Sequence, residues 1–341
     1  MRKYELPRFG LDHLRIVDAP APTAGPHQVV VRVHAVSPNF RDVLVVEGQY
    51  NPRLKLPCTP MSDAAGVVES IGPEVSRVKV GDLVMTHFVA DWLDGPYQGR
   101  YLGSTLGTPG PGVAAELIVV PQDPLVPIPA HLSLAEAATL PIAALTAWSA
   151  LVTEGKLARG QTMLTLGTGG VSIFALQIAK AIGARCIITS SSDQKLMRAK
   201  ELGADATINY SRHQEWEKQV LEYTENHGAD VVVENGGVGT LGQSLRAVRP
   251  GGVIAMLGAL TGLEGKVNLA PVLMKRVRIA GILVDSRASF LSMRQFFEQH
   301  RIQPVIDSRF SFDQLRAALK HLKDGKHFGK IVVDVEPAEA I

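Results

Sequence analysis

The stretch that decides the fold is Thr162–Ser192, which reads TMLTLGTGGVSIFALQIAKAIGARCIITSSS. A short apolar strand ends at Leu166, a glycine-rich turn follows, and an amphipathic helix comes after the turn. Gly167 permits the sharp turn, and Gly169 lets the backbone come close to a pyrophosphate. The helix start supplies unpaired N–H groups and a positive dipole end for the phosphates. The stretch therefore predicts a dinucleotide-binding turn, with the small Ser172 at the third glycine position.

The end of the second strand indicates which dinucleotide is bound. NAD-selective folds usually place Asp or Glu there, where the carboxylate accepts hydrogen bonds from the ribose hydroxyls. Here the strand ends Thr189-Ser190-Ser191-Ser192, the first acid is Asp193, and Lys195 follows. Small hydroxyls beside a cation suit a 2′-phosphate, so the sequence predicts NADPH in preference to NADH. The alternative is a solvent-facing serine turn followed by an ordinary helix lysine.

The chain around this turn alternates strands with helices. Such alternation is typical of right-handed βαβ crossovers and a doubly wound parallel sheet. A tail of two helices and a final strand follows Asp285. The predicted strands of the sheet are Met163–Leu166, Cys186–Thr189, Val231–Glu234, Val253–Leu257 and Arg278–Leu283, and the tail contains helices at Ser289–His300 and Phe312–Lys323 and a strand at Lys330–Val335.

The first ~125 residues are expected to be rich in β-structure, because short apolar runs there are separated by turn residues. Between the predicted strands Asp82–Phe88 and Ala115–Val120, the Gly/Pro-rich stretch Trp92–Gly112 predicts a surface excursion or lid. Ser133 with Glu136 predicts the N-terminus of a helix that starts at Leu134. The predicted strands are Gln28–Val36, Ala64–Ile71, Asp82–Phe88 and Ala115–Val120.

Composition narrows the class of protein. The 341 residues suggest about two domains. A formal net charge of +2 and 46% hydrophobic residues argue against disorder and give no electrostatic reason to expect nucleic-acid or membrane binding. The two cysteines, Cys58 and Cys186, exclude a disulfide scaffold and a Cys-rich zinc cluster. The first residues lack the apolar stretch of a signal peptide, which predicts a cytoplasmic protein.

A series of short motifs runs along the whole chain: Ser37-Pro38-Asn39-Phe40-Arg41-Asp42, Ser62-Asp63-Ala64-Ala65-Gly66, Val80-Gly81-Asp82, Ala138-Thr139-Leu140-Pro141, Leu202-Gly203-Ala204-Asp205, Ile208-Asn209-Tyr210, Pro250-Gly251-Gly252 and His327-Phe328-Gly329-Lys330. In this order and spacing the chain resembles the medium-chain dehydrogenase/reductase superfamily, and within it the zinc-lacking, quinone oxidoreductase-like branch. The resemblance implies an α/β protein in which residues 1–128 and 285–341 form a split GroES-like catalytic domain. Residues 129–284 would form the Rossmann nucleotide-binding domain between them. A homodimer is also implied.

The resemblance also bears on metal binding. In zinc-dependent members, ligands stand at positions that here hold Asn39, Met61-Ser62-Asp63 and Ile142 or a neighbour. A catalytic zinc needs three protein ligands with N, S or O donors. Asp63 alone could serve, so no metal site is expected.

The resemblance further implies which residues form the site. Asn39, Tyr50 and Ser62 are the candidate catalytic residues around the nicotinamide and substrate. Tyr50 could instead be a half-buried packing residue, Asp42 a helix cap and Arg41 a surface ion-pair residue. The candidate cofactor-binding residues are Asn39, Thr146, Gly167, Thr168, Gly169, Gly170, Val171, Ser190, Ser191, Lys195, Tyr210, Gly236, Gly258, Phe328 and Gly329.

Without a metal site, the predicted chemistry is hydride transfer that does not depend on a strong acid or base group of the protein. The chain has no Tyr-x-x-x-Lys pair and no nucleophile elbow. The protein would then mainly bind and orient NADPH, which suits acceptors already activated by conjugation. The predicted function is hydride transfer to a quinone or an α,β-unsaturated carbonyl compound. The alternatives are a metal-free alcohol dehydrogenase or aldehyde reductase, and a non-catalytic NADPH-binding redox sensor.

Overall fold

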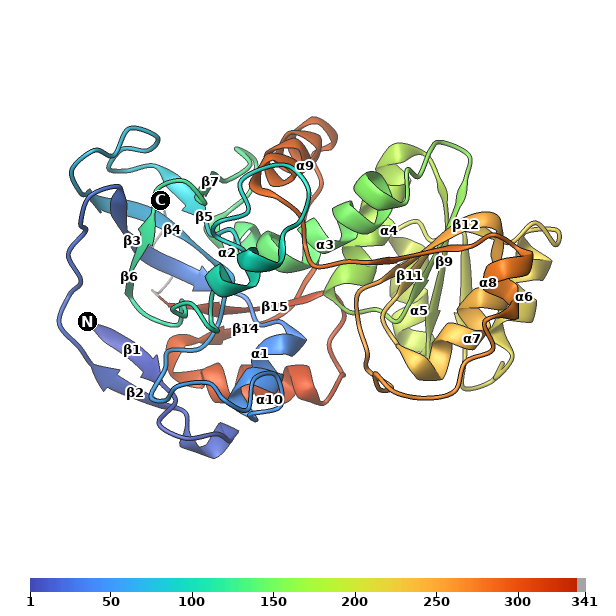
Figure 1. The fold of residues 1–341 in the computed structure, drawn as a ribbon, viewed down its shortest axis with the longest axis horizontal. Coiled ribbons are helices and arrows are strands. Elements are labelled where there is room, and N and C mark those ends of the chain that lie inside the picture. Colours follow the sequence, from blue (N-terminus) through green and yellow to red (C-terminus); the bar gives the residue numbers. More distant parts are fainter. Residues whose placement is uncertain (336–341) are drawn as a thin grey trace. The chain divides into compact units, whose positions relative to one another are not determined.

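The computed structural model describes residues 1–335, which Figure 1 draws as a ribbon. The chain divides into two compact units. The first unit combines Met1–Ala143 with the chain from Ser286 onward, and the second unit is Ala144–Asp285.

The second unit is built on a six-stranded sheet whose paired strands are all parallel. The strands lie in the order β10-β9-β8-β11-β12-β13, and the order reverses between β8 and β11. Ligands of open α/β sheets bind outside the carboxyl ends of the strands at such a reversal. The bounds are β8 (Thr162–Leu166), β9 (Arg185–Ser190), β10 (Ala206–Asn209), β11 (Ala229–Glu234), β12 (Val248–Met256) and β13 (Arg278–Gly281).

The helices of this unit follow the strands, so the predicted doubly wound fold is confirmed. After β8, α4 begins beyond the extended Gly169 and ends at Gly183, which has a left-handed φ of 85°. Leucine and isoleucine side chains from the strands, such as Leu164 and Ile254, are fully buried in its core. The helices are α4 (Gly170–Ile182), α5 (Asp193–Glu201), α6 (Trp216–Tyr223), α7 (Val238–Ala247) and α8 (Ala270–Met274).

The first unit is built on a mixed sheet of seven strands in the order β14-β15-β3-β4-β5-β7, with β6 also paired to β3. The C-terminal strand β15 runs antiparallel to β3, pairing Val333 with Val36, so the tail completes the N-terminal sheet. The predicted bounds of β3 and β4 are confirmed. The strands are β3 (Gln28–Val36), β4 (Ala64–Ile71), β5 (Leu83–Met85), β6 (Leu117–Pro121), β7 (Val126–Pro127), β14 (Ile306–Ser311) and β15 (Lys330–Asp334).

Short elements surround this sheet. A separate two-stranded sheet pairs β1 with β2, and α1 and α10 pack against each other. Tyr4 of β1 donates its hydroxyl to the Phe312 carbonyl, which ties the first strand to the tail. The bounds are β1 (Arg2–Glu5), η1 (Leu11–His13), β2 (Arg15–Asp18), α1 (Phe40–Val46), η2 (Gly99–Ser104), α9 (Arg287–His300), η5 (Phe312–Gln314) and α10 (Leu315–Lys323).

The division between the units falls inside a run of helical segments. These are α2 (Leu134–Ala137), η3 (Leu140–Ala144), α3 (Leu145–Trp148) and η4 (Ser149–Glu154), of which η3 and η4 are π-helical. The expected capping box is present, because Ser133 and Glu136 exchange hydrogen bonds at the start of α2. The division lies later than the predicted boundary after residue 128, because α2 packs against β3, β4 and β15 of the first unit.

The stretch Trp92–Gly112 is more than a surface excursion, so that prediction was partly wrong. Trp92 and Tyr101 are 8% and 7% exposed, and their rings stack 6.1 Å apart. The backbone N–H of Arg287 donates to the Trp92 carbonyl, which fixes the stretch to the start of α9. The stretch is partly buried because its aromatic side chains pack together, and its glycines and prolines do not indicate this burial.

No helix within residues 1–335 is long and apolar enough to cross a membrane. Both cysteines are free thiols: Cys186 is buried in the second unit, and Cys58 is half-buried in the first.

Candidate active site

Three strand ends of the first unit bring Asn39, Asp63 and Lys330 together. Asn39 lies just after β3, Asp63 just before β4, and Lys330 begins β15. Because β3 pairs with both β4 and β15 near Val36, these ends meet at one edge of the sheet. The Ser37 hydroxyl donates to the Ile331 carbonyl at 2.7 Å, which fixes the β3 end against β15.

The side chain of Asn39 bridges the two charged residues. Lys330 Nζ donates to Asn39 Oδ1 and to the Pro38 carbonyl, both at 2.8 Å. Asn39 Nδ2 donates to Asp63 Oδ2 at 2.9 Å. The same carboxylate oxygen accepts the backbone N–H of Ile142 at 3.1 Å. Asn39 is therefore held at both ends of its amide.

Burial controls the charges of this network. Asp63 and Lys330 are 0% and 4% exposed. Burial raises the pKa of Asp63 to about 7, against the attraction of Lys330 and the hydrogen bond from Asn39. Burial also lowers the pKa of Lys330 to about 8, against the attraction of Asp63 and Asp42. The two groups can therefore gain or lose a proton near neutral pH.

Arg41 lies inside the first unit, so the prediction of a surface ion-pair residue was wrong. Its side chain is 10% exposed. Arg41 Nη1 donates to Asp42 Oδ1 at 3.0 Å and to Ser62 Oγ at 3.2 Å. Asp42 also caps α1, as expected, because its Oδ2 accepts the Asn39 backbone N–H at 2.8 Å. Burial raises the pKa of Asp42, although Arg41 opposes this.

Two aromatic rings lie against the Arg41 guanidinium. Its Cζ is 4.8 Å from the ring centre of Tyr50 and 4.7 Å from that of Phe88. Cation–π contacts of this kind hold a buried guanidinium in place. Tyr50 is 42% exposed and Phe88 is 2% exposed. Tyr50 thus packs half-buried on the arginine, and its ring is the more accessible of the two covers.

The residues at the zinc-ligand positions do not fit a zinc ion. The groups at these positions are the Asn39 amide, the Ser62 hydroxyl, the buried Asp63 carboxyl and the Ile142 backbone N–H, and each makes a hydrogen bond within the protein. The Asp63 oxygen that faces Asn39 already accepts two hydrogen bonds. Within residues 1–335 no group of three or more His, Cys, Asp or Glu side chains is arranged to hold a metal ion.

The glycine-rich turn of the second unit has the geometry that a dinucleotide needs. Gly167 follows β8 with a φ of 77°, and no protein atom lies within 4 Å of a Cβ built on it. Thr168, Gly169, Gly170 and Val171 complete the turn and begin α4. The Ser172 hydroxyl donates to the Leu166 carbonyl at 2.8 Å and joins the helix to the strand. These residues fit a bound pyrophosphate.

At the end of β11 lie two residues that the sequence analysis did not select, and one of them, Asn235, supports the glycine-rich turn. Asn235 Nδ2 donates to the Leu166 carbonyl at 2.8 Å, across the order reversal. The fully buried Glu234 accepts the backbone N–H groups of Gly236 and Gly237 at 2.7 and 3.1 Å. A Cβ on Gly258 would lie 2.5 Å from the Asn235 carbonyl oxygen. Only their position at the end of β11 could have indicated Glu234 and Asn235.

The end of β9 and the residues directly after it carry hydroxyl side chains and no acidic side chain before Asp193. Ser190 is buried and accepts the Ser192 N–H at 3.2 Å, while Ser191 is exposed. Asp193 is engaged by Asn209 at 2.7 Å and by Arg212, a cation that the sequence reading did not select. Lys195 lies in the first turn of α5, and the exposed Tyr210 directly follows β10.

The other candidate residues divide between the two units. Thr146 is buried in α3 of the second unit. Phe328 and Gly329 precede β15 in the first unit, and Phe328 is 1% exposed. Gly329 has a φ of 81°, and a Cβ there would lie 2.4 Å from the Val305 carbonyl oxygen.

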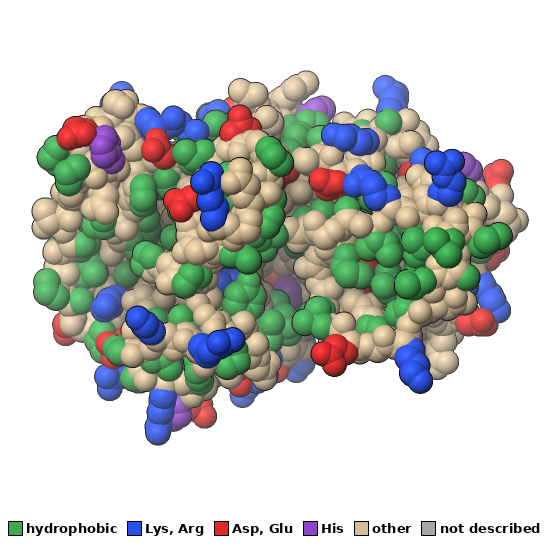
Figure 2. All heavy atoms as spheres, viewed as in Figure 1, with side chains coloured by type: hydrophobic (Ala, Val, Ile, Leu, Met, Phe, Trp, Pro, Cys, Tyr) green, Lys and Arg blue, Asp and Glu red, His purple; other side chains and the backbone are tan. Residues whose placement is uncertain are grey.

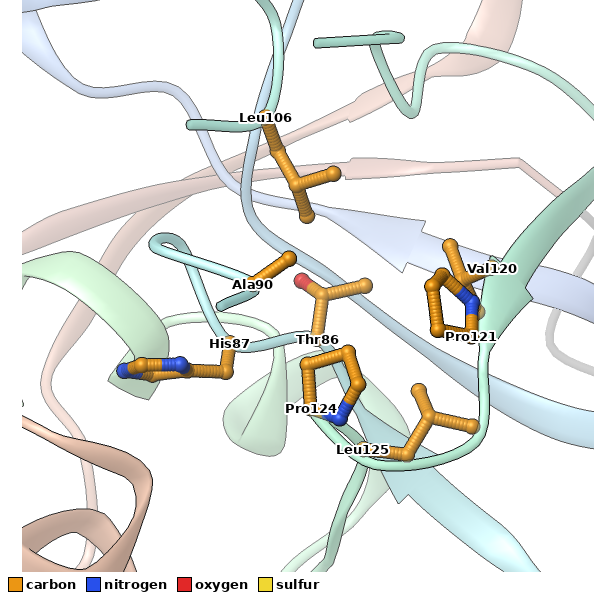
Figure 3. Close-up of a pocket in the computed structure, with 8 residues that line it drawn as sticks. All are labelled: Thr86, His87, Ala90, Leu106, Val120, Pro121, Pro124 and Leu125. Atoms are coloured by element: carbon orange, nitrogen blue, oxygen red, sulfur yellow. The ribbon is translucent and has the colours of Figure 1, made fainter. Parts of the chain in front are cut away.

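Two hollows in the first unit contain none of the candidate site residues. One is a cavity of about 10 Å³ between Thr86, Leu106, Pro124 and Leu125, shown in Figure 3. The other is an open groove of about 250 Å³ beside Lys3 and Val119. The smaller one has room for no more than about one water molecule.

Comparisons with known proteins define the family. Residues 25–130 match the alcohol dehydrogenase GroES-like domain, and residues 170–299 match the zinc-binding dehydrogenase family. The chain belongs to the medium-chain dehydrogenase/reductase superfamily of oxidoreductases.

Individual relatives cover nearly the whole chain. The zinc-type alcohol dehydrogenase-like protein C1773.06c of Schizosaccharomyces pombe is 39% identical over 96% of both chains. Quinone oxidoreductase-like protein 2 of Bos taurus is 31% identical over 91% of this chain and 86% of its own. The crystal structure of an NAD-dependent alcohol dehydrogenase is 34% identical, with a TM-score of 0.91 over 98% of this chain and all of its own.

Proposed function

We propose that this protein is a zinc-independent, NADPH-dependent oxidoreductase that transfers a hydride to a quinone or an α,β-unsaturated carbonyl compound. The observation that carries the proposal is the donor set at the zinc-ligand positions. Asn39, Ser62 and Asp63 offer an amide, a hydroxyl and a buried carboxyl that already hydrogen-bond one another or their neighbours.

The acceptor class follows from the lack of a strong Lewis acid in this set. An alcohol dehydrogenase with zinc uses the ion to polarise the substrate oxygen. Without that help, the favoured acceptors are those whose carbon is already electrophilic through conjugation. NADPH would supply the hydride, and the protein's part is to bind and orient both molecules.

The preference for NADPH rests on the charges around the end of β9. Ser190 and Ser191 place hydroxyls where NAD-selective folds usually place a carboxylate. Lys195 lies in the first turn of α5, and Arg212 pairs with Asp193, so that the nearest acid is neutralised. Family membership alone does not select the cofactor, since one similar structure is an NAD-dependent alcohol dehydrogenase.

Protein treated with EDTA is expected to oxidise NADPH in the presence of quinones and enones. We expect kcat/KM for NADPH to exceed that for NADH by at least about tenfold, which corresponds to about 1.4 kcal/mol. The measurement is the loss of nicotinamide absorbance at 340 nm with a panel of quinones, enones, aldehydes and simple alcohols.

The control is the same panel after addition of Zn²⁺, which is expected to leave the rates unchanged. Turnover of simple alcohols alone would contradict the acceptor class, and a preference for NADH would contradict the cofactor. NADPH binding without turnover of any acceptor would support a redox sensor instead.

We also propose that the enzyme is a homodimer that pairs through the β13 side of the second unit. Within the described chain β13 lies at the edge of its sheet, and its Ile279 is 37% exposed. Next to it in sequence, Leu273 and Met274 of α8 are 78% and 85% exposed, as are other apolar side chains of the preceding loop. Figure 2 shows hydrophobic side chains gathered on this unit. Exposed edge strands and apolar patches of this kind mark association surfaces.

The native protein is therefore expected to have twice the 36.6 kDa mass of one chain in light scattering. The double substitution Leu273→Asp/Met274→Asp is expected to give monomers, because two charges would be buried in the interface. Met197→Asp on α5 changes a methionine that is 66% exposed and lies away from this surface, and it serves as the control. A wild-type monomer, or a dimer that survives the double substitution, would contradict the proposal.

A further inference from the structure

The guanidinium of Arg41 is buried, and its neighbours satisfy only part of it. Nη1 makes hydrogen bonds to Asp42 and Ser62. Nε and Nη2 are also buried, and neither has a hydrogen-bond partner among the described residues. Buried donors are nearly always paired in folded proteins, so an unpaired set needs an explanation. A guanidinium has five N–H donors, and those on Nε and Nη2 remain for a partner that binds.

The surroundings of Arg41 limit how that partner can approach. The rings of Tyr50 and Phe88 both lie against the guanidinium. The N–H bonds lie in the plane of the guanidinium, so an oxygen reaches it along the Nε–Nη2 edge. Phe88 is almost fully buried, whereas Tyr50 is 42% exposed and lies in a loop. Tyr50 is therefore the more accessible of the two rings beside the arginine.

The position of Arg41 connects this free edge to the proposed reaction. Arg41 touches Ser62 through a hydrogen bond and Tyr50 through its ring, and these are two of the three candidate catalytic residues. An acceptor lined by Ser62 and Tyr50 would lie within reach of the same guanidinium.

The charges of the cluster also favour a negatively charged oxygen. Arg41 and Lys330 face the acids Asp42 and Asp63 in the first unit. Burial raises the pKa of both acids. Burial thus opposes the negative charge of both acids, whereas a guanidinium keeps its positive charge.

We propose that the Nε–Nη2 edge of Arg41 binds the carbonyl oxygen of the acceptor and stabilises the negative charge that it gains during reduction. The inference rests on the proposed function. Addition of a hydride to the β-carbon of an enone breaks the C=C π bond and moves an electron pair onto the carbonyl oxygen, giving an enolate. NADPH is oxidised to NADP⁺ in this step, and the enolate then takes a proton from water. Arg41 is thus a catalytic residue for the proposed reaction.

The test uses the complex of the protein with NADP⁺ and two probes of similar shape. 4-Nitrophenolate carries an oxyanion, and 4-nitroanisole is a neutral compound without that charge. Arg41→Met is expected to weaken binding of the phenolate by at least about tenfold, while binding of the anisole and of NADP⁺ stays unchanged. Removal of one oxyanion donor typically lowers kcat by about 10²–10³-fold, and we expect a loss of this size for enones.

Two further variants separate catalysis from structure. Arg41→Lys keeps the buried positive charge for folding but loses the planar fork, so it is also expected to bind the phenolate less tightly. Arg53→Met, in the exposed loop after Tyr50, is the matched control and is expected to change neither probe. Guanidinium chloride, but not sodium chloride, is expected to restore part of the turnover of Arg41→Ala.

The outcomes distinguish this inference from the proposed function. Equal binding of both probes by the wild type and Arg41→Met would show that Arg41 holds only ordered water, and would overturn the inference. So would normal enone turnover by Arg41→Met or Arg41→Lys. If the wild type reduces no quinone or enone but binds the phenolate through Arg41, the proposed function fails and the oxyanion site stands.

Discussion

Replacement of Lys330 by methionine is expected to lower the free energy of unfolding by about 3–5 kcal/mol, because it leaves the buried carboxyl of Asp63 without the cation that attracts it through the Asn39 bridge. The substitution removes the donor to Asn39 Oδ1 and to the Pro38 carbonyl. It also removes the cation that stabilises the ionised carboxylate form of Asp63. Chemical denaturation followed by circular dichroism measures the loss.

The pH dependence of stability provides a second readout. Folded Asp63 keeps its proton up to about pH 7, whereas the unfolded chain loses this proton near the ordinary carboxyl pKa. Between these two pH values the unfolded chain binds fewer protons than the folded chain, so the free energy of unfolding falls as pH rises. Folded Lys330 loses its proton near pH 8, before the unfolded chain does, so the wild type regains stability as pH rises further. Lys330→Met should lack this gain. Its Asp63 should have a still higher pKa, so the decline should continue above neutral pH.

Two controls identify the cause. The exposed Lys320→Met on α10 is expected to change stability by less than about 0.5 kcal/mol. The double variant Lys330→Met/Asp63→Asn removes both charges and is expected to recover part of the loss. A cost below about 1 kcal/mol for Lys330→Met would show that the pair contributes little to the fold.

Gly167→Val is expected to raise the dissociation constant for NADPH by at least about 100-fold, or about 2.8 kcal/mol at 1.4 kcal/mol per factor of ten. No protein atom lies within 4 Å of a Cβ on Gly167, so the new side chain would project into the space where the pyrophosphate should lie. Isothermal titration of NADPH into the folded variant measures the effect.

Gly160→Val is the matched control for backbone strain. Gly160 also has a left-handed φ, 82°, and nothing within 4 Å of its Cβ, but it lies before β8 and away from the turn. Both substitutions are expected to cost about 1–3 kcal/mol of stability through the strained backbone. Equal NADPH affinities of the two variants would contradict the placement of the cofactor at Gly167.

Much of the fold could be predicted because its signals are local. The bounds of β3 and β4 follow from apolar runs that end at turn residues, and Ser133 with Glu136 begins α2 as expected. The strands β10 and β14 were missed. Ala206–Asn209 is only four residues long, and Ile306–Ser311 has no fully buried residue to give it a pattern.

The site was predicted less completely, because its contacts join distant parts of the chain. Asn235 supports the glycine-rich turn through the Leu166 carbonyl, yet nothing in the sequence around it distinguishes it from other polar residues after a strand. Arg41 was expected at the surface, because an Arg-Asp pair is usually solvated. Only the folded chain shows that its side chain is 10% exposed and lies against the rings of Tyr50 and Phe88.

The sequence by itself determined the family, the doubly wound nucleotide-binding unit and the turn at Gly167, since strand periodicity and glycine spacing are properties of neighbouring residues. The tertiary structure alone decided which polar residues of the first unit lie together and how deeply they are buried. Lys330 reaches Asn39 across 291 positions of sequence because β15 pairs with β3. Burial at that junction then shifts the charges of Asp63 and Lys330, and burial is a property of the folded chain that no local pattern records.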